Sequence, residues 1–186
     1  MPLVDQSAVF RDGEGDAWFR RNAGALSATR PVDRTAEATL RAIDATDARS
    51  ICEVGCSNGW RLAQLGERYP GLQLAGFDVS EAAIAEGSAA WPGLTLRSGT
   101  ADAPPFDAPF DVVIVSFVLH WVGRAQLARS IAAIDGLVRD GGTLETYALE
   151  EEVVFTYSSG VLGPVEDDQD RAVCTVLHRN LKRSNI

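Results

Sequence analysis

Short apolar runs alternate with helical patterns along the middle of the chain, between residues 50 and 149. Runs rich in Val, Ile, Leu and Phe are typical of strands buried in a sheet, whereas apolar residues at three- and four-residue spacing indicate an amphipathic helix. This pattern predicts strands at residues 50–54, 72–78, 94–99, 110–122 and 143–149, helices at 59–69, 80–91 (with Ser80 as N-cap) and 124–138, and a turn at 139–142. Such alternation indicates crossover units, and hence a mostly parallel sheet with helices on both faces.

The segments on either side of this region follow other patterns. Residues 15–28 and 33–45 predict two helices, which are separated because Pro31 breaks the helical pattern. Residues 152–157 and 171–178 predict two strands that pair antiparallel at one edge of the sheet. Together these elements predict a Rossmann-like α/β fold, with an open, mostly parallel seven-stranded sheet, helices on both faces and an antiparallel edge hairpin.

Length, composition and charge narrow the class of protein. A chain of 186 residues with 46% hydrophobic and 23% charged residues is typical of one globular domain. Its net charge of −9 would repel phosphate backbones and anionic membrane surfaces, so we expect a small-molecule partner, no nucleic acid and no membrane. The N-terminal residues lack a basic start followed by an apolar stretch, and we therefore expect the protein in the cytoplasm.

The three cysteines do not form a pattern typical of disulfides or of a metal centre. Cys52 and Cys56 lie close together, but an iron–sulfur cluster needs further thiolates, and Cys174 is distant in the sequence. We expect Cys52 to be a buried strand residue and Cys56 to belong to a tight turn, with no metal bound.

The stretch ICEVGCSNGWRL contains a turn of small residues between a predicted strand and a predicted helix, with Gly55 and Gly59 in it. Glycines at this place allow a ligand to approach the backbone. A nicotinamide dinucleotide fold requires G-x-G-x-x-G, but Ser57 and Trp60 occupy the second and third glycine positions here. No Lys-Ser or Lys-Thr pair follows, so the turn is not a phosphate loop. The acid Glu53 at the end of the strand suits a cationic or hydrogen-donating ligand.

The same stretch, as EVGCSNG, resembles the E/D-x-G-x-G-x-G motif of class I S-adenosylmethionine-dependent methyltransferases, and the order of elements over residues 35–179 is similar to that family. Asp78 in GFDVS stands where the family places an acid that accepts hydrogen bonds from both ribose hydroxyls, and a carboxylate can accept two such bonds. Asp102 in SGTADAPPF resembles the acid that accepts from the adenine amino group. LVRDGGTL resembles the L-x-P-G-G block before strand five.

This resemblance implies a cofactor site at the carboxyl ends of the strands. Its expected residues are Gly55, Cys56, Ser57 and Gly59 beside the methionine part, Asp78 and Val79 at the ribose, and Ala101, Asp102 and Ser116 on the adenine side. Glu53 would orient the turn or the ammonium group of the ligand. Ser57 replaces the middle glycine of the motif, which such a turn tolerates if the φ of Ser57 is negative.

The N-terminal stretch FRDGEGDAWFRRN resembles the F-G-D-x-Y-x-x-R-N opening of methylases associated with pseudaminic acid biosynthesis. The resemblance implies that Trp18 and Arg21 close over the cofactor and that Arg21 pairs with a carboxylate. The alternative is a helix whose Trp18 and Phe19 only dock on the core.

The stretch LHWV, at the end of the fourth predicted strand, resembles small-molecule methyltransferases such as the trans-aconitate type. His120 would then be catalytic and take a proton from a hydroxyl or carboxyl nucleophile. The alternative is a histidine that packs against the cofactor or caps the loop. We expect Trp121 to form a pocket wall.

We therefore expect an enzyme that transfers a methyl group from S-adenosyl-L-methionine to a small-molecule acceptor by in-line displacement. The expected layout is a single methyltransferase domain over residues 1–186, with a helical lid at 1–34, a cofactor-binding core at 35–149 and edge strands at 150–186. Two alternatives are a cofactor-binding, non-catalytic partner subunit and, disfavoured by the incomplete glycine pattern, a nicotinamide-dependent oxidoreductase.

Overall fold

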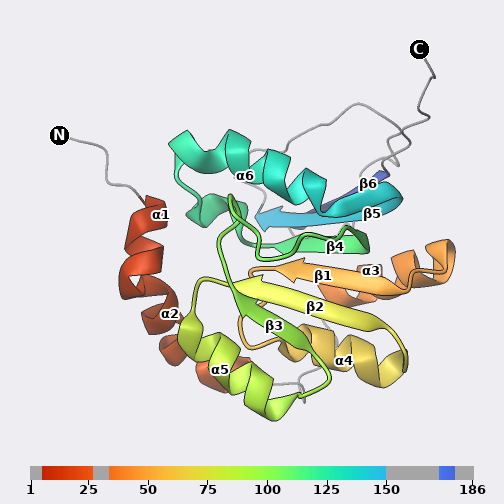
Figure 1. Cartoon of the computed structure of the whole chain (residues 1–186), viewed down its shortest axis with the longest axis horizontal. Helices are drawn as coiled ribbons and strands as arrows, with labels where there is room; N and C mark the ends of the chain where they lie inside the picture. Colours follow the sequence, from red (N-terminus) through yellow and green to blue (C-terminus); the bar gives the residue numbers. More distant parts are fainter. Residues whose placement is uncertain (1–5, 27–33, 150–171, 179–186) are drawn as a thin grey trace.

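The computed structural model describes residues 6–26, 34–149 and 172–178, which form an α/β fold around one central sheet (Figure 1). Within these residues the sheet has six strands in the order β3-β2-β1-β4-β5-β6. Strands β1 to β5 run parallel, and β6 is antiparallel to β5. The strands are β1 Ser50–Val54, β2 Gln73–Asp78, β3 Thr95–Ser98, β4 Phe110–Ser116, β5 Val138–Leu149 and β6 Ala172–His178.

Helices precede the sheet and connect its strands. Among the connections, α4 joins β1 to β2, α5 joins β2 to β3, and α6 joins β4 to β5. The helices are α1 Gln6–Val9, the π-helical turn η1 Phe10–Glu14, α2 Gly15–Asn22, the 3-10 turn η2 Ala23–Ala25, α3 Arg34–Thr46, α4 Trp60–Arg68, α5 Glu81–Ala90, the 3-10 turn η3 Leu119–Trp121 and α6 Arg124–Gly136. None of the described helices combines the length and the apolar character that crossing a bilayer requires.

Neighbouring residues of the central strands face two separate hydrophobic cores. Ile51 of β1 packs in one cluster with Ile43 of α3 and Leu62 of α4. Cys52, the next residue along β1, packs in the other cluster with Ile134 of α6. Because successive strand residues point to opposite faces, α3 and α4 cover one face of the sheet and α6 covers the other. Helices on both faces and a buried Cys52 confirm the prediction.

Two boundaries differ from the predicted ones. β4 ends at Ser116, because Phe117 has a φ of 55°, which is incompatible with an extended strand, so the predicted strand to residue 122 is too long. The predicted turn at 139–142 is instead an irregularity within β5, where the register with β4 shifts and Gly141 has a φ of 79°. Apolar periodicity predicted the pairing regions but not these interruptions.

Two other predictions concern the ends of the chain. The strand predicted at 171–178 is found as β6, where Thr143 of β5 lies opposite His178. The strand predicted at 152–157 lies outside the described residues, so the seven-stranded sheet with an edge hairpin stays a prediction. The helix predicted at 15–28 is found as α2, followed by η2, and residues 27–33 also lie outside the described residues.

The strand order reverses at β1, which pairs with β2 on one side and with β4 on the other. In an open α/β sheet, the carboxyl ends of the strands at such a point border the ligand crevice. The segments that follow β1, β2, β3 and β4 therefore meet at one edge of the sheet.

Candidate functional site

The turn between β1 and α4 brings bare backbone to this edge. The amides of Gly55 and Cys56 both donate to the carbonyl of Phe77, over 2.8 and 3.1 Å, which ties the turn to β2. Gly55 has a φ of 69°, and a Cβ at this position would lie 2.3 Å from Cγ2 of Val118. Gly59 precedes α4 with a φ of 78°. Gly55 thus allows the close approach of Val118, and the approach of a ligand to this turn stays a prediction.

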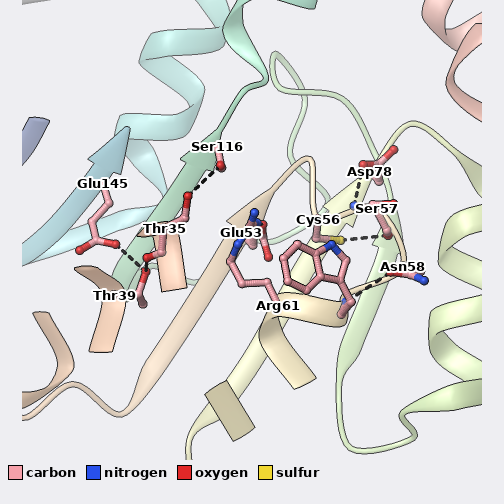
Figure 2. Close-up of polar contacts among 11 residues, drawn as sticks. Thr35, Thr39, Glu53, Cys56, Ser57, Asn58, Arg61, Asp78, Ser116 and Glu145 are labelled. Carbon is pink, nitrogen blue, oxygen red and sulfur yellow. Dashed lines mark hydrogen bonds and ion pairs between the residues drawn. The ribbon is translucent and has the colours of Figure 1, made fainter. Parts of the chain in front are cut away.

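Ser57 departs from the expected geometry. Its φ is 52°, so the expectation of a negative φ was wrong. The turn needs a left-handed residue at this position, which glycine adopts without the strain of a Cβ. The amide of Ser57 donates to Oδ2 of Asp78 over 2.8 Å, as Figure 2 shows. Serine therefore keeps the backbone shape of the motif at a conformational cost.

Cys56 occupies the tight turn, as expected, and is almost fully buried. Burial and the nearby carboxylates of Asp78 and Glu53 raise the pKa of its thiol well above the ordinary value. A neutral thiol is a poor nucleophile, so Cys56 contributes shape and not covalent chemistry.

Glu53 lies beneath the turn and is not part of the cavity wall. Its buried carboxylate forms an ion pair with Arg61 in the first turn of α4 (Figure 2). Arg61 also lies over the ring of Trp60, 4.7 Å from the ring centroid, and lines the cavity. Of the two expected roles for Glu53, this pair favours orientation of the turn. The sequence analysis did not single out Arg61. An arginine among apolar residues at the start of a helix indicates that a buried acid lies nearby.

Asp78 is the last residue of β2 and lines the cavity. Besides the bond from Ser57, its Oδ1 accepts the amide of Ser80 over 2.9 Å. Two carboxylate oxygens have four lone pairs, so Asp78 retains acceptor capacity after these bonds and the backbone hydrogen bond from Val79. Burial raises the pKa of this carboxyl, and the backbone hydrogen bonds partly oppose that effect.

The loops after β3 and β4 complete this side of the cavity. Ala101 and Asp102 line it, and Oδ2 of Asp102 lies 3.9 Å from Nε of Arg129 on α6. Ser116 lines it from the end of β4, with its Oγ 3.2 Å from Oγ1 of Thr35 on α3. Parallel strands bring these residues together because their carboxyl ends share one edge.

The N-terminal segment covers part of the cavity. Trp18 of α2 lines the cavity, while the neighbouring Phe19 is buried in the core, so the helix both docks and faces the site. Arg21 does not line the cavity, and its guanidinium pairs with Glu14, seven residues earlier in the chain. Arg21 thus pairs with a carboxylate of the chain itself, and its closure over the cofactor stays a prediction. Asp16 belongs to the N-terminal motif, but its role was not expected: it accepts hydrogen bonds from the start of α5.

His120 lies in η3 and lines the cavity, with its ring centroid 4.6 Å from that of Trp121. Gln6 donates to the His120 carbonyl over 3.5 Å, so the N-terminal segment contacts this turn. Trp121 lines the cavity, as expected of a pocket wall. Phe10, whose ring centroid is 4.7 Å from that of Trp121, was not expected at the site.

These residues border one cavity of about 480 Å³, a size within the range of cofactor and small-molecule sites. The predicted site residues that line it are Trp18, Gly55, Cys56, Ser57, Asp78, Val79, Ala101, Asp102, Ser116 and His120. Arg21, Glu53 and Gly59 are not part of its lining.

Comparison with known proteins identifies the domain type. Residues 51–142 match the family model described as a methyltransferase domain. A trans-aconitate 2-methyltransferase of Acidovorax sp. (strain JS42) is 40% identical over 81 residues, which cover 42% of this chain and 31% of that protein. The chain spans about a third of the length of the curated relatives it matches.

Solved methyltransferase structures share the fold. The amino pentose methyltransferase from Micromonospora echinaspora, with bound S-adenosylmethionine, has a TM-score of 0.60 at 23% identity over 87% of this chain and 69% of that one. The magnesium protoporphyrin IX methyltransferase from Synechocystis PCC 6803 has a TM-score of 0.66 at 14% identity over 97% of this chain and 100% of that one. Residues 51–142 therefore match a methyltransferase domain, and the chain shares the fold of these solved methyltransferases.

Proposed function

We propose that the chain binds S-adenosyl-L-methionine in the cavity and transfers its methyl group to a small-molecule acceptor. The surroundings of Asp78 carry the proposal. A carboxylate that retains acceptor capacity and the backbone of Gly55 line the same cavity. A ribose diol and the methionine part attached to it need these two features side by side. The domain match and the relatives support the same cofactor.

In this proposal the cofactor lies across the carboxyl ends of β1 to β4. Asp78 would hold the ribose hydroxyls, and residues 55–57 together with Trp18 would hold the methionine part. The residues assigned to the adenine side are Ala101, Asp102 and Ser116, with Val79 beside the ribose. All of these positions border the cavity, which supports the assignment.

Bound S-adenosylmethionine supplies a methyl group on a positively charged sulfur, which leaves as a neutral thioether. The nucleophile of the acceptor attacks in line as the bond from the methyl carbon to sulfur breaks. The chain then has to align the acceptor and exclude water, and both tasks suit a cavity covered by an N-terminal helix. His120 would accept the proton that the nucleophile loses.

Isothermal titration calorimetry tests the cofactor assignment. We expect both S-adenosylmethionine and S-adenosylhomocysteine to bind, and Asp78→Ala to weaken binding by about 1–3 kcal/mol, the cost of losing hydrogen bonds to a charged acceptor. Asp47→Ala is the matched control, because the Asp47 side chain is 94% exposed. Absence of binding heat with folded protein, or equal affinities for the wild type and Asp78→Ala, would contradict the assignment.

The non-catalytic partner subunit remains the alternative hypothesis. Release of S-adenosylhomocysteine with any acceptor from a panel would exclude it, whereas cofactor binding without turnover across the panel would favour it. We also propose the layout expected from the sequence, with a lid over residues 1–34, a core at 35–149 and edge strands at 150–186, in a cytoplasmic protein.

A further inference from the structure

Aromatic side chains form the cavity wall between the N-terminal segment and the turn after β4. Phe10 of η1 lies against Trp121 of η3, and Phe117, just before that turn, also lines the cavity. The amide of Gly123 donates to Oγ of Ser7 over 3.0 Å, which holds the two segments together. The proposed cofactor does not use Phe10, Phe117 or Trp121, so this aromatic wall is available to the acceptor.

Two side chains of the aromatic wall are more exposed to solvent than large apolar side chains usually are. Phe117 is 39% exposed and Trp121 is 37% exposed, and these two belong to the small group of exposed large hydrophobic residues in the described part of the chain. A ligand face that covers them gains the free energy of removing apolar surface from water. The positive φ of Phe117 is costly for a bulky residue, and such strain is typical of places where function needs the conformation.

The charged side chains around the cavity disfavour an anionic acceptor. Among the described lining residues, Arg61 pairs with Glu53, while Asp78 and Asp102 contribute carboxylates. His120 has to be neutral to accept a proton. An acceptor carboxylate would lose its hydration here with no cation among these residues that is not already paired, and it would lie near two acids.

We propose that the acceptor is an uncharged molecule with a planar ring, which lies against Phe10, Phe117 and Trp121 and presents its nucleophile to His120. The nucleophile, such as a ring hydroxyl, gains the methyl group and loses its proton to the histidine. The inference rests on the proposed methyl transfer and narrows its substrate class. It separates this chain from the curated relatives named for trans-aconitate, a tricarboxylate.

A matched pair of ring compounds tests this inference. Para-hydroxybenzamide and para-hydroxybenzoate share the ring and differ in charge, so their affinities, and that of trans-aconitate, are measured by NMR titration of protein saturated with S-adenosylhomocysteine. We expect the amide to bind about tenfold more tightly than either carboxylate, because only the carboxylates lose ionic hydration. Equal or reversed affinities, or no binding of the amide, would overturn the inference and leave the cofactor assignment intact. Failure of S-adenosylhomocysteine itself to bind would overturn both.

Variants of the aromatic wall locate the binding. Trp121→Ala should weaken the amide about tenfold, because a large ring contact is lost, while S-adenosylhomocysteine affinity stays unchanged. Trp91→Ala is the matched control, since Trp91 caps the end of α5 and does not line the cavity. An amide affinity that is the same in Trp121→Ala and the control would overturn the placement of the ring.

Discussion

The carboxylate of Asp16 on α2 accepts a hydrogen bond from the hydroxyl of Ser80, the N-cap of α5, over 2.7 Å. The same oxygen of Asp16 accepts a hydrogen bond from the amide of Ala82 over 3.1 Å. The carboxylate therefore caps the N-terminus of α5 and docks α2, its own helix, against it. The amide of Ser80 in turn donates to Asp78. Ser80 therefore links the N-terminal segment to the acid that we assign to the ribose.

Removal of this link should loosen the N-terminal segment. We expect Asp16→Ala to lower the free energy of unfolding by about 1 kcal/mol, to speed amide hydrogen exchange in α2 and to weaken S-adenosylhomocysteine binding. The hydrogen bond from Ser80 lowers the pKa of Asp16, so the stabilisation is present above the ordinary carboxyl pKa and is lost as the pH falls through the folded-state value. Asp12→Ala, at an exposed residue of the same segment, is the control. Unchanged exchange in α2 would refute the link.

Glu145 of β5 is a fully buried acid outside the cavity lining. Oγ1 of Thr39 lies 2.6 Å from its Oε2 and 2.9 Å from the carbonyl of Thr35 (Figure 2). Thr39 is the donor in both contacts, so its single hydroxyl hydrogen is shared between the Thr35 carbonyl and the Glu145 carboxyl. Burial raises the pKa of Glu145 to about 7, although the hydrogen bond from Thr39 and the charge of Arg41 act in the opposite direction.

This acid should make stability depend on pH. Because the folded-state pKa is raised from 4.5 to about 7, the folded state retains a proton that the unfolded state loses, and stability falls as the pH rises through this window. The expected loss is roughly 3 kcal/mol in the free energy of unfolding by urea. Glu145→Gln should remove this dependence, whereas Glu67→Gln, at an exposed residue, should retain it. A wild-type profile that is flat over this range would contradict the expectation.

The left-handed conformation of Ser57 predicts opposite effects for two substitutions. Ser57→Gly should stabilise the folded state by about 1–2 kcal/mol, because it relieves the backbone strain. It should also cost about 0.5–1 kcal/mol, because glycine makes the unfolded chain more flexible. Thermal stability should therefore be equal or slightly higher. Ser57→Val should lower the melting temperature, because β-branched residues are strained at positive φ. The glycine variant keeps the amide that donates to Asp78 and should still bind S-adenosylhomocysteine. A clearly less stable glycine variant would show that the serine side chain matters more than its backbone strain.

Gly87 is buried inside α5, where helix propensity alone would favour alanine by about 1 kcal/mol. A Cβ there would lie 2.1 Å from the carbonyl oxygen of Asn58 in the β1–α4 turn, and backbone cannot move aside cheaply. We expect Gly87→Ala to cost about 1–3 kcal/mol, measured by thermal unfolding. Gly136→Ala, at a helical glycine with open space around it, should be neutral or stabilising. Equal stabilities of the two variants would contradict the contact.

The sequence alone predicted the elements of the core and the edge of the sheet that bears the site. Periodicity located β1 to β3 within a residue and the paired parts of β4 and β5, because buried parallel strands require continuous apolar runs. Asp78 and Asp102 could be expected at one edge since each follows a strand of the same direction. Gly55 could be expected at a close approach, because the turn carries few side chains.

The tertiary structure decided which side chains meet. Arg21 pairs with Glu14, and Asp16, to which the N-terminal motif assigned no role, docks the N-terminal helix. The contact between Phe10 and Trp121 joins segments far apart in the chain. The local pattern of apolar and polar residues indicates which face of a helix or strand is apolar. Hydrogen bonds, ion pairs and ring contacts depend instead on residues that are distant in the sequence. Those neighbours exist only once the sheet has brought the segments together, and they determine the shape and charge of the cavity.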